Sequence, residues 1–331
     1  MNLLEVKNLS INFISEGIEL PAVSDLSFEV KTGEILAIVG ESGCGKSVTC
    51  LSLSRLVPQP PGIYSSGEII YKGGKGDIDV LKLTIAHLRE FRRHCISYIF
   101  QEPSVSLNPV FKIGDQIAES INLRGNFHGD MKTEICRLLS DVGIPEPAQK
   151  IKAYPHELSG GMQQRAMIAM ALAGNPKILV ADEPTTALDV TIQAQILELL
   201  REIRKNTGMT IILVTHNLGI VAEMADRVVI MYAGHSVESA DTRTILANPL
   251  HPYTQALLEA VPKLGHSKNE VLNTIKGNVP SPSNYPKGCR FIGRCPLAES
   301  LNTEDINRCA KIIPEWREIR KGHFCRCHFS K

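Results

Sequence analysis

The sequence predicts an α/β protein built on a mainly parallel β-sheet, and two patterns carry this prediction. Short runs of aliphatic and β-branched residues alternate with helical patterns, as in units where a helix connects two parallel strands. These runs lie at 35–39, 178–181, 211–215 and 228–232. A glycine-rich loop, GESGCGKS, follows the first run and precedes a helical pattern, which is the context of a phosphate-binding loop.

The segments around this core differ from it in character. Residues 3–13 and 22–30 are expected to form an antiparallel pair of strands. Residues 102–173 lack strand signals and show helical periodicity at 113–122 and 131–142, so we expect a helical insertion there. Further along, the segment VPSPSNYPKG predicts a linker. We therefore expect a main domain over 1–250 and a C-terminal extension over 251–331.

Composition restricts the class of protein. The chain has 331 residues, 43% hydrophobic and 21% charged, with a formal net charge of +1. This balance is typical of a folded globular protein and shows no basic excess that would favour a nucleic-acid partner. The apolar runs are too short to cross a membrane, and the N-terminus lacks the pattern of a signal peptide. We therefore expect a cytoplasmic protein that reaches a membrane only through a partner.

The glycine-rich loop predicts a nucleotide site. Its glycines allow backbone N–H groups to converge on phosphate oxygens at the start of a helix. Lys46 is expected to reach the β- and γ-phosphates of ATP, and the Ser47 hydroxyl to bind Mg²⁺. A glycine-rich turn that matches by chance is the alternative. The expected nucleotide-binding residues of this loop are Gly40, Ser42, Gly43, Cys44, Gly45, Lys46, Ser47 and Val48.

Two adjacent carboxylates follow the apolar run at 178–181. Asp182 and Glu183 end a strand expected to be buried, where uncompensated charges are costly. Asp182 is suited to a magnesium role, and Glu183 to polarising a water molecule for attack on the γ-phosphate. Alternatively, the pair is simply solvated at the end of the strand. Together with the phosphate-binding loop, it predicts a P-loop nucleoside triphosphatase.

The segment LSGGMQQR, at 158–165, narrows the class further. Ser159 is able to cap a helix, and the two glycines leave its N–H groups open to a second phosphate. Taken alone, this is also an ordinary helix cap. The segment resembles the signature motif of the ABC ATPase family, which implies that two cassettes close head to tail around two ATP molecules. The signature residues that this resemblance assigns to the partner's ATP are Ser159, Gly160, Gly161 and Gln163.

Other motifs of that family follow in order along the chain. Gln101 resembles the Q-loop glutamine that contacts Mg²⁺, and Asp189 resembles the D-loop aspartate at the dimer interface. His216 resembles the switch histidine, which implies a catalytic role with Glu183 and Gln101. Phe13 resembles the aromatic residue that stacks on adenine. The resemblance implies a RecA-like P-loop core, an antiparallel β subdomain and a helical insertion.

The end of the chain resembles one branch of the family. The segments NPLHPYTQALLEAVP and GCRFIGRCP are similar to the C-terminal region of ATP-binding subunits that serve dipeptide, oligopeptide and nickel importers. This implies integral membrane permease partners, a second ATP-binding subunit that is homologous or identical, and an indirect link to an extracytoplasmic substrate-binding protein. The protein would then lie on the cytoplasmic face of the membrane. A soluble, non-transport ABC ATPase is the alternative.

Five of the nine cysteines lie between positions 289 and 327. Four thiolates suit either zinc or an iron–sulfur cluster. The wide spacing favours a four-iron four-sulfur (4Fe-4S) cluster. Such a cluster resembles what some members of the importer branch carry. Incidental thiols and a redox- or iron-responsive regulator are the alternatives. The expected ligands are Cys289, Cys295, Cys309 and Cys327, with Cys325 as the spare.

Overall fold

A computed structural model describes residues 1–74, 76–125, 127–186, 188–260 and 275–331. Two β-sheets form its centre. The larger has the strand order β11-β12-β10-β9-β3-β8-β7-β6. Its strands are β3 (Ile35–Val39), β6 (Ile96–Ile99), β7 (Ile178–Asp182), β8 (Thr210–Thr215), β9 (Arg227–Tyr232), β10 (His235–Asp241), β11 (Arg317–Arg320) and β12 (His323–Cys325).

The strands from β9 to β6 are parallel, whereas β10, β12 and β11 extend the same sheet with antiparallel pairs. Strands β3 and β8 are buried along their whole length because both faces of the parallel part are covered, one by helices and the other largely by the smaller sheet. This confirms the predicted parallel core and adds strands at both of its edges that the sequence patterns did not reveal.

The smaller sheet is antiparallel and has the order β2-β1-β4-β5. Its long hairpin confirms the strand pair expected near the N-terminus. The strands are β1 (Asn2–Ser15), β2 (Ile18–Lys31), β4 (Gly62–Tyr71) and β5 (Ile78–Asp79). Buried residues of this sheet share a hydrophobic core with β3, β7 and β8.

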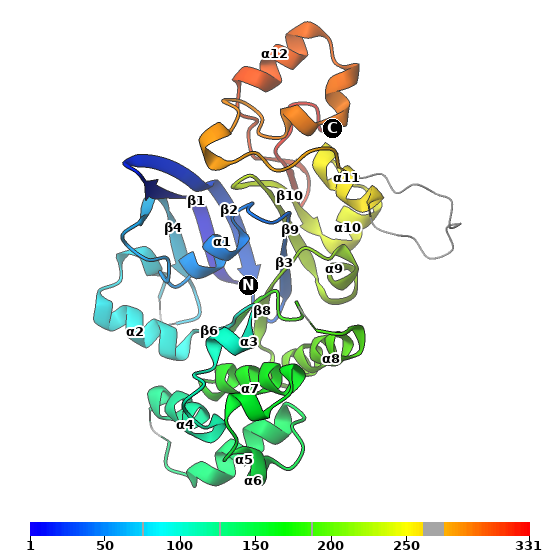
Figure 1. Ribbon diagram of the computed structural model, residues 1–331. Coiled ribbons are helices and arrows are strands. Elements are labelled where there is room, and N and C mark those ends of the chain that lie inside the picture. Colours follow the sequence, from blue (N-terminus) through cyan, green and yellow to red (C-terminus); the bar gives the residue numbers. More distant parts are fainter. Residues whose placement is uncertain (75, 126, 187, 261–274) are drawn as a thin grey trace.

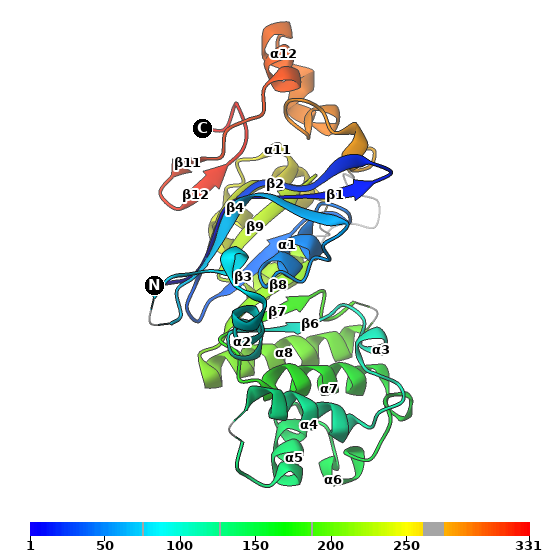
Figure 2. The same ribbon diagram turned by 90° about the vertical axis from the view of Figure 1, so that its left-hand side faces the viewer.

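A group of helices follows β6 and precedes β7, and Figure 2 shows it at one end of the molecule. Ile117, Leu138 and Ile168 come from three of these helices and share one core. The helices are α3 (Pro103–Ser106), α4 (Ile113–Arg124), α5 (Met131–Asp141), α6 (Pro147–Lys150), η2 (Pro155–Glu157) and α7 (Gly160–Ala173).

The other helices cover the sheets or belong to the C-terminal part. They are α1 (Lys46–Ser52), η1 (Val80–Lys82), α2 (Ile85–His94), α8 (Val190–Thr207), α9 (Leu218–Met224), α10 (Thr242–Ala247), α11 (Pro252–Glu259), η3 (Pro282–Asn284), η4 (Ile292–Arg294), η5 (Pro296–Ser300) and α12 (Thr303–Lys311). In the described part of the chain, none of the helices is both long and apolar enough to cross a membrane.

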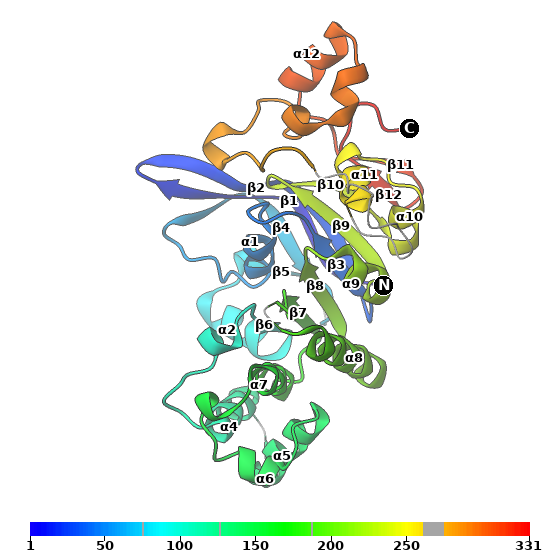
Figure 3. The same cartoon turned by 45° about the vertical axis from the view of Figure 1, so that its right-hand side comes forward.

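The C-terminal extension does not stand apart from the main sheet. Strand β12 pairs with β10, so the last residues add to the sheet edge, as Figure 3 shows. His323 Nε2 lies 2.7 Å from Glu238 Oε1, and both side chains are buried. Backbone pairing and a buried polar contact therefore join the end of the C-terminal extension to the core sheet.

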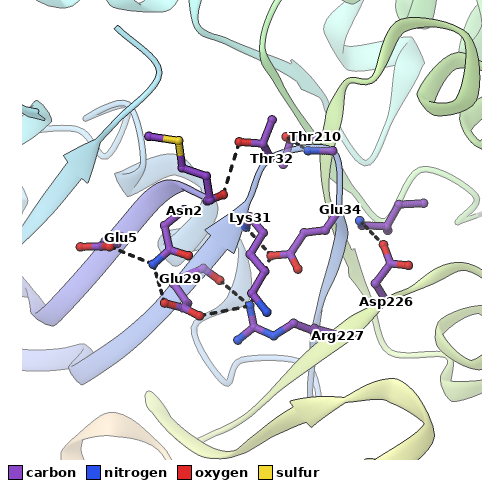
Figure 4. A network of polar contacts seen from close by, with 12 residues as sticks. Asn2, Glu5, Glu29, Lys31, Thr32, Glu34, Thr210, Asp226 and Arg227 are labelled. Atoms are coloured by element: carbon purple, nitrogen blue, oxygen red, sulfur yellow. Dashed lines mark hydrogen bonds and ion pairs between the residues drawn. The ribbon is translucent and has the colours of Figure 1, made fainter. Parts of the chain in front are cut away.

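The turn between β2 and β3 joins the two sheets through polar contacts, shown in Figure 4. Arg227, on β9, donates to the carbonyl oxygen of Glu29 and to Glu34 Oε1, both at 3.3 Å. The Gly33 N–H donates to the Thr210 hydroxyl at 2.8 Å. Burial raises the pKa of Glu34, and Lys31 and Arg227 offset part of this effect.

We expect Glu34→Ala to lower the free energy of unfolding by about 3 kcal/mol, because the buried Arg227 guanidinium loses a carboxylate partner. Urea denaturation measures this change. Glu29→Ala is the matched control, since that carboxylate is more exposed and lies 3.8 Å from Arg227, and its loss should cost less than about 1 kcal/mol. Equal losses for both variants would contradict the assignment.

Candidate functional site

A pocket of about 340 Å³ opens between the two sheets and the start of α1. Its volume lies within the usual range of small-molecule sites. The lining residues come from the phosphate-binding loop, the ends of three strands, β2 and the C-terminal extension. They are Ala22, Ser42, Gly43, Gly45, Lys46, Ser47, Val48, Gln101, Glu183, His216, Pro282 and Tyr285.

Four neighbouring parallel strands deliver the polar groups of this pocket. The phosphate-binding loop follows β3, Gln101 follows β6, Glu183 follows β7 and His216 follows β8. Because the strands run in the same direction, their carboxyl ends meet at one edge of the sheet, where ligands bind in open α/β sheets. Residues far apart in sequence thus reach one pocket.

The phosphate-binding loop needs glycine at Gly45, the N-cap residue of α1. Its φ is +99°, and an added Cβ would lie 2.6 Å from the Ala22 carbonyl oxygen. Backbone strain and the neighbouring strand therefore both exclude a side chain there. The bare loop leaves the N-terminus of α1 facing the pocket, which favours an anion.

Lys46 supplies the positive charge of the loop. Its ammonium group donates to the carbonyl oxygens of Gly40 at 2.8 Å and Glu41 at 3.0 Å. Only 6% of the residue is exposed. An ammonium group has three N–H donors, so the two carbonyls orient it and leave one donor for a phosphate oxygen.

Asp182 and Ser47 fit a magnesium ion. Burial raises the pKa of Asp182, and a hydrogen bond with Ser47 offsets part of this shift. Asp182 Oδ1 is buried and has no hydrogen-bond partner among the described residues. Mg²⁺ usually binds one or two protein oxygens together with phosphates and water, so an unpartnered carboxylate oxygen beside a hydroxyl is a suitable donor set.

The Glu183 carboxylate contacts the other predicted catalytic residues. Gln101 Nε2 donates to Oε2 at 3.1 Å, and His216 Nδ1 lies 3.2 Å from Oε1. The Thr186 hydroxyl also donates to Oε2, at 2.8 Å. Glu183 itself has a φ of +46°, a conformation that costs free energy in a residue with a side chain and that clusters at functional sites.

These contacts keep Glu183 ionised. Burial raises the pKa of its carboxyl group, but the hydrogen bonds with Thr186 and His216, together with the charges of His216 and Lys46, hold the pKa below its usual value. The neighbouring Asp182 shifts in the opposite direction. The two adjacent carboxyl groups therefore have pKa values shifted in opposite directions. Such a separation of pKa values is typical of carboxyl groups with different chemical roles.

The predicted signature residues lie at the start of α7 and do not line the pocket. The Ser159 hydroxyl accepts from the Met162 N–H at 3.4 Å, so it caps the helix. Ser159 and Gly160 are exposed, while Gln163 Nε2 donates to the Pro155 and Leu158 carbonyls. Asp189 similarly caps α8 through the Ile192 N–H at 2.9 Å.

Three predicted nucleotide residues, Phe13, Gly40 and Cys44, lie outside the pocket lining. The Cys44 side chain is fully buried, and burial raises its pKa to about 11, so it packs in the core beneath the loop. Phe13 packs against the core of the smaller sheet and pairs with Gly62 across β1 and β4. Phe13 is therefore not among the residues that line the pocket.

The four predicted cysteine ligands line one small apolar cavity, together with Phe291 and Phe329. Cys325 lies on β12 and does not line this cavity. Burial is the main reason why the pKa values of all four thiols are raised, that of Cys289 to about 12. Among the described residues, no three His, Cys, Asp or Glu side chains are grouped closely enough to hold a single metal ion.

Comparison with known proteins supplies the family. The family described as ABC transporter matches residues 23–186, and that described as oligopeptide/dipeptide transporter, C-terminal region, matches residues 237–300. A protein of Brucella ovis named a peptide import ATP-binding protein is 46% identical over 332 residues, which cover 98% of this chain and 96% of that protein. The chain belongs to the ABC transporter family. A peptide ABC transporter ATP-binding protein of Sinorhizobium fredii is 44% identical and covers 98% of this chain and 94% of its own length.

Solved structures agree with the ABC cassette fold. A dimeric ATP-binding cassette in a post-hydrolysis state, bound to ADP and Pi, is 26% identical, with a TM-score of 0.63. It covers 72% of this chain and 99% of that one. The cbiO1 protein of Clostridium perfringens, part of the ABC transporter complex cbiONQ, gives a TM-score of 0.62 at 26% identity, over 75% of this chain and 91% of that one.

Sequence reasoning missed several residues of this ABC site. Thr186 lies three residues after Glu183 and donates a hydrogen bond to its carboxylate. The segment EPTT indicated this contact, because it places a hydroxyl group about one turn from the carboxylate. Pro282 and Tyr285 had no such signal, because only the fold brings the extension to the pocket.

Thr186→Ala should move the acid limb of the ATPase pH profile to higher pH, by less than about one unit. The sign follows from the hydrogen bond: Thr186 lowers the pKa of Glu183, so its removal raises that pKa and a higher pH is needed to ionise the base. Initial rates measured across the pH range test this. Thr186→Ser keeps a donor and should leave the limb in place; a limb that moves to lower pH contradicts the assignment.

Proposed function

We propose that this chain is the ATP-hydrolysing subunit of an ABC importer for peptides. The observation that carries the proposal is the Glu183 carboxylate, which contacts Thr186 and His216 at the edge of a pocket that also contains Lys46. ABC family membership and the names of the relatives, which are peptide import ATP-binding proteins, support the transport part of the proposal.

In this mechanism, the phosphate-binding loop and Lys46 hold the β- and γ-phosphates of ATP. Glu183 accepts a proton from the attacking water, since its carboxylate lines the same pocket as Lys46. His216 and Gln101 contact the same carboxylate and orient it, and both reach the pocket where charge develops on the γ-phosphate. Asp182 and Ser47 would hold Mg²⁺, which neutralises phosphate charge.

The signature motif acts on a second cassette in this proposal. Ser159 and Gly160 are exposed at the N-terminus of α7, outside the pocket of their own chain. A helix N-terminus with bare glycine N–H groups favours an anion, and the γ-phosphate held by the partner cassette is the anion that family resemblance assigns to it. ATP therefore closes the dimer, and hydrolysis opens it.

An exposed apolar surface beside Gln101 is suited to the permease partners. Phe100, Val105, Val110 and Phe111 are all exposed, and they surround α3 at the start of the helical insertion. Such a cluster on a soluble surface is typical of a protein interface. Contact with integral membrane subunits there would place the chain on the cytoplasmic face of the membrane and join it indirectly to a substrate-binding protein.

We also propose an iron–sulfur cluster at Cys289, Cys295, Cys309 and Cys327. Their common apolar cavity supports this, and a cluster of several iron atoms accepts thiolates that are more widely spaced than the ligands of one ion. The cavity also excludes Cys325 from the ligand set. Bound iron would offset the cost of four buried thiolates.

Glu183→Gln should bind ATP with unchanged affinity and lower the turnover number by at least about a hundredfold, because the amide cannot accept the proton. Steady-state ATPase rates and nucleotide binding, measured with the permease subunits in membrane vesicles, test this. The same variant should abolish uptake of a labelled dipeptide.

Lys46→Ala is the complementary variant, since it should weaken nucleotide binding itself. If Glu183→Gln hydrolysed ATP at the wild-type rate, Glu183 would not be the catalytic base. A second outcome is that both variants change the ATPase rate as expected but wild-type vesicles take up no peptide. This would keep the ATPase assignment and reject peptides as the transported substrate.

For the cysteine site, protein purified without oxygen should contain about four irons and matching sulfide per chain, with a broad visible absorption band. Cys309→Ser should lose iron. Cys136→Ser and Cys325→Ser are the controls, because neither residue lines the cavity. Both variants should retain their iron. A single zinc per chain, or iron lost equally from Cys325→Ser, would contradict the proposal.

A further inference from the structure

Two residues of the C-terminal extension line the nucleotide pocket, although they are far from the phosphate-binding loop in sequence. Pro282 begins η3 and Tyr285 follows it, and both face the pocket with Lys46 and Ala22. The turn η3 lies against β2, and Figure 1 shows the orange segment that follows the grey trace passing beside the β1–β2 hairpin. The nucleotide-binding motifs of the sequence do not include this segment.

The Tyr285 ring is held in place by Arg290. The guanidinium carbon of Arg290 lies 4.2 Å from the ring centroid, a favourable cation–π arrangement. Arg290 in turn donates to the Ser24 hydroxyl on β2 at 2.9 Å and to the carbonyl oxygen of Ala233. One face of the ring is therefore packed against a group anchored to both sheets, and the ring has a defined position at the pocket.

A second anchor ties the same segment to the phosphate-binding loop. The Arg294 guanidinium donates to both carboxylate oxygens of Glu41, at 2.9 and 3.1 Å. It also donates to the carbonyl oxygens of Lys276 at 2.9 Å and Gly277 at 3.0 Å. A buried, bidentate guanidinium–carboxylate pair is strong and directional. The segment that carries Tyr285 is thus fixed to the loop that binds phosphate.

The position of Tyr285 matches the nucleoside end of the pocket. Glu183 and His216 follow strands of the larger sheet and define the γ-phosphate end, whereas Tyr285 lies with Ala22 on the side of the smaller sheet. Phe13, the aromatic residue expected to stack on the base, lies on that same sheet but does not line the pocket. Of these two aromatic residues, Phe13 and Tyr285, it is Tyr285 that lines the pocket.

We propose that Tyr285 is a nucleotide-binding residue supplied by the C-terminal extension, contacting the ribose and base of the bound nucleotide. This inference rests on the proposed ATP-binding function. An aromatic ring packs well against the face of a base or sugar. The extension that carries the cysteine cavity thereby takes part in nucleotide binding through Tyr285, the residue that follows η3.

Calorimetry on the full-length chain with ADP and with inorganic pyrophosphate tests the proposal, because neither ligand is hydrolysed at the γ position. Tyr285→Ala should weaken ADP binding about tenfold and leave pyrophosphate binding unchanged, since pyrophosphate lacks the nucleoside. Tyr285→Phe keeps the ring and should bind ADP nearly as well as the wild type. Trp316→Ala is the matched control, because it removes an aromatic side chain of the extension that does not line the pocket.

Each other outcome overturns a distinct claim. Unchanged ADP affinity in Tyr285→Ala, with Lys46→Ala still weakening ADP binding, overturns the role of Tyr285 alone. Equal weakening of ADP and pyrophosphate means that the ring only supports the phosphate-binding loop. Tighter ADP binding means that the segment obstructs the pocket. Unchanged affinity in Lys46→Ala overturns the proposed nucleotide site itself, and thermal melting of each variant separates these results from unfolding.

Discussion

The site depends on one constraint, the parallel alignment of β3, β8, β7 and β6. Neighbouring parallel strands end at the same edge, so the loop after each strand reaches the same space. The phosphate-binding loop, His216, Glu183 and Gln101 occupy four successive loops of this kind. Continuous burial of strands such as β3 keeps the edge rigid, because their apolar side chains pack on both faces. A register shift in any one strand would displace its polar group from the pocket.

Electrostatics at this edge separates two neighbouring carboxylates. Burial raises the pKa of Asp182, and within the described part of the chain its Oδ1 has no hydrogen-bond partner, which suits a bound cation. The hydroxyl and imidazole beside Glu183 lower its pKa, which favours the charged carboxylate. The difference arises from what surrounds each group and not from the residue type. The positive φ of Glu183 is part of the same arrangement, since it turns this side chain toward Gln101 and His216.

The C-terminal extension is joined to the core in three ways. Strand β12 continues the main sheet, Arg294 pairs with Glu41 of the phosphate-binding loop, and Arg290 links Tyr285 to β2. The cysteine cavity is lined by residues of the same extension, Cys289 and Cys295 among them, so the cavity and the Arg290 and Arg294 anchors share one segment of the chain.

Local patterns in the sequence determined the class of protein and the chemistry of its main motifs. The strands at 35–39 and 211–215, the helical periodicity at 113–122 and the glycine-rich loop each depend on neighbouring residues, so they are legible without a fold. The edge strands β6 and β11, the hydrogen bond from Thr186, and the position of Tyr285 depend on partners that the local sequence does not reveal. Only the tertiary structure decided these, because short edge strands carry weak patterns and because side chains from separate loops meet only after the parallel sheet has formed.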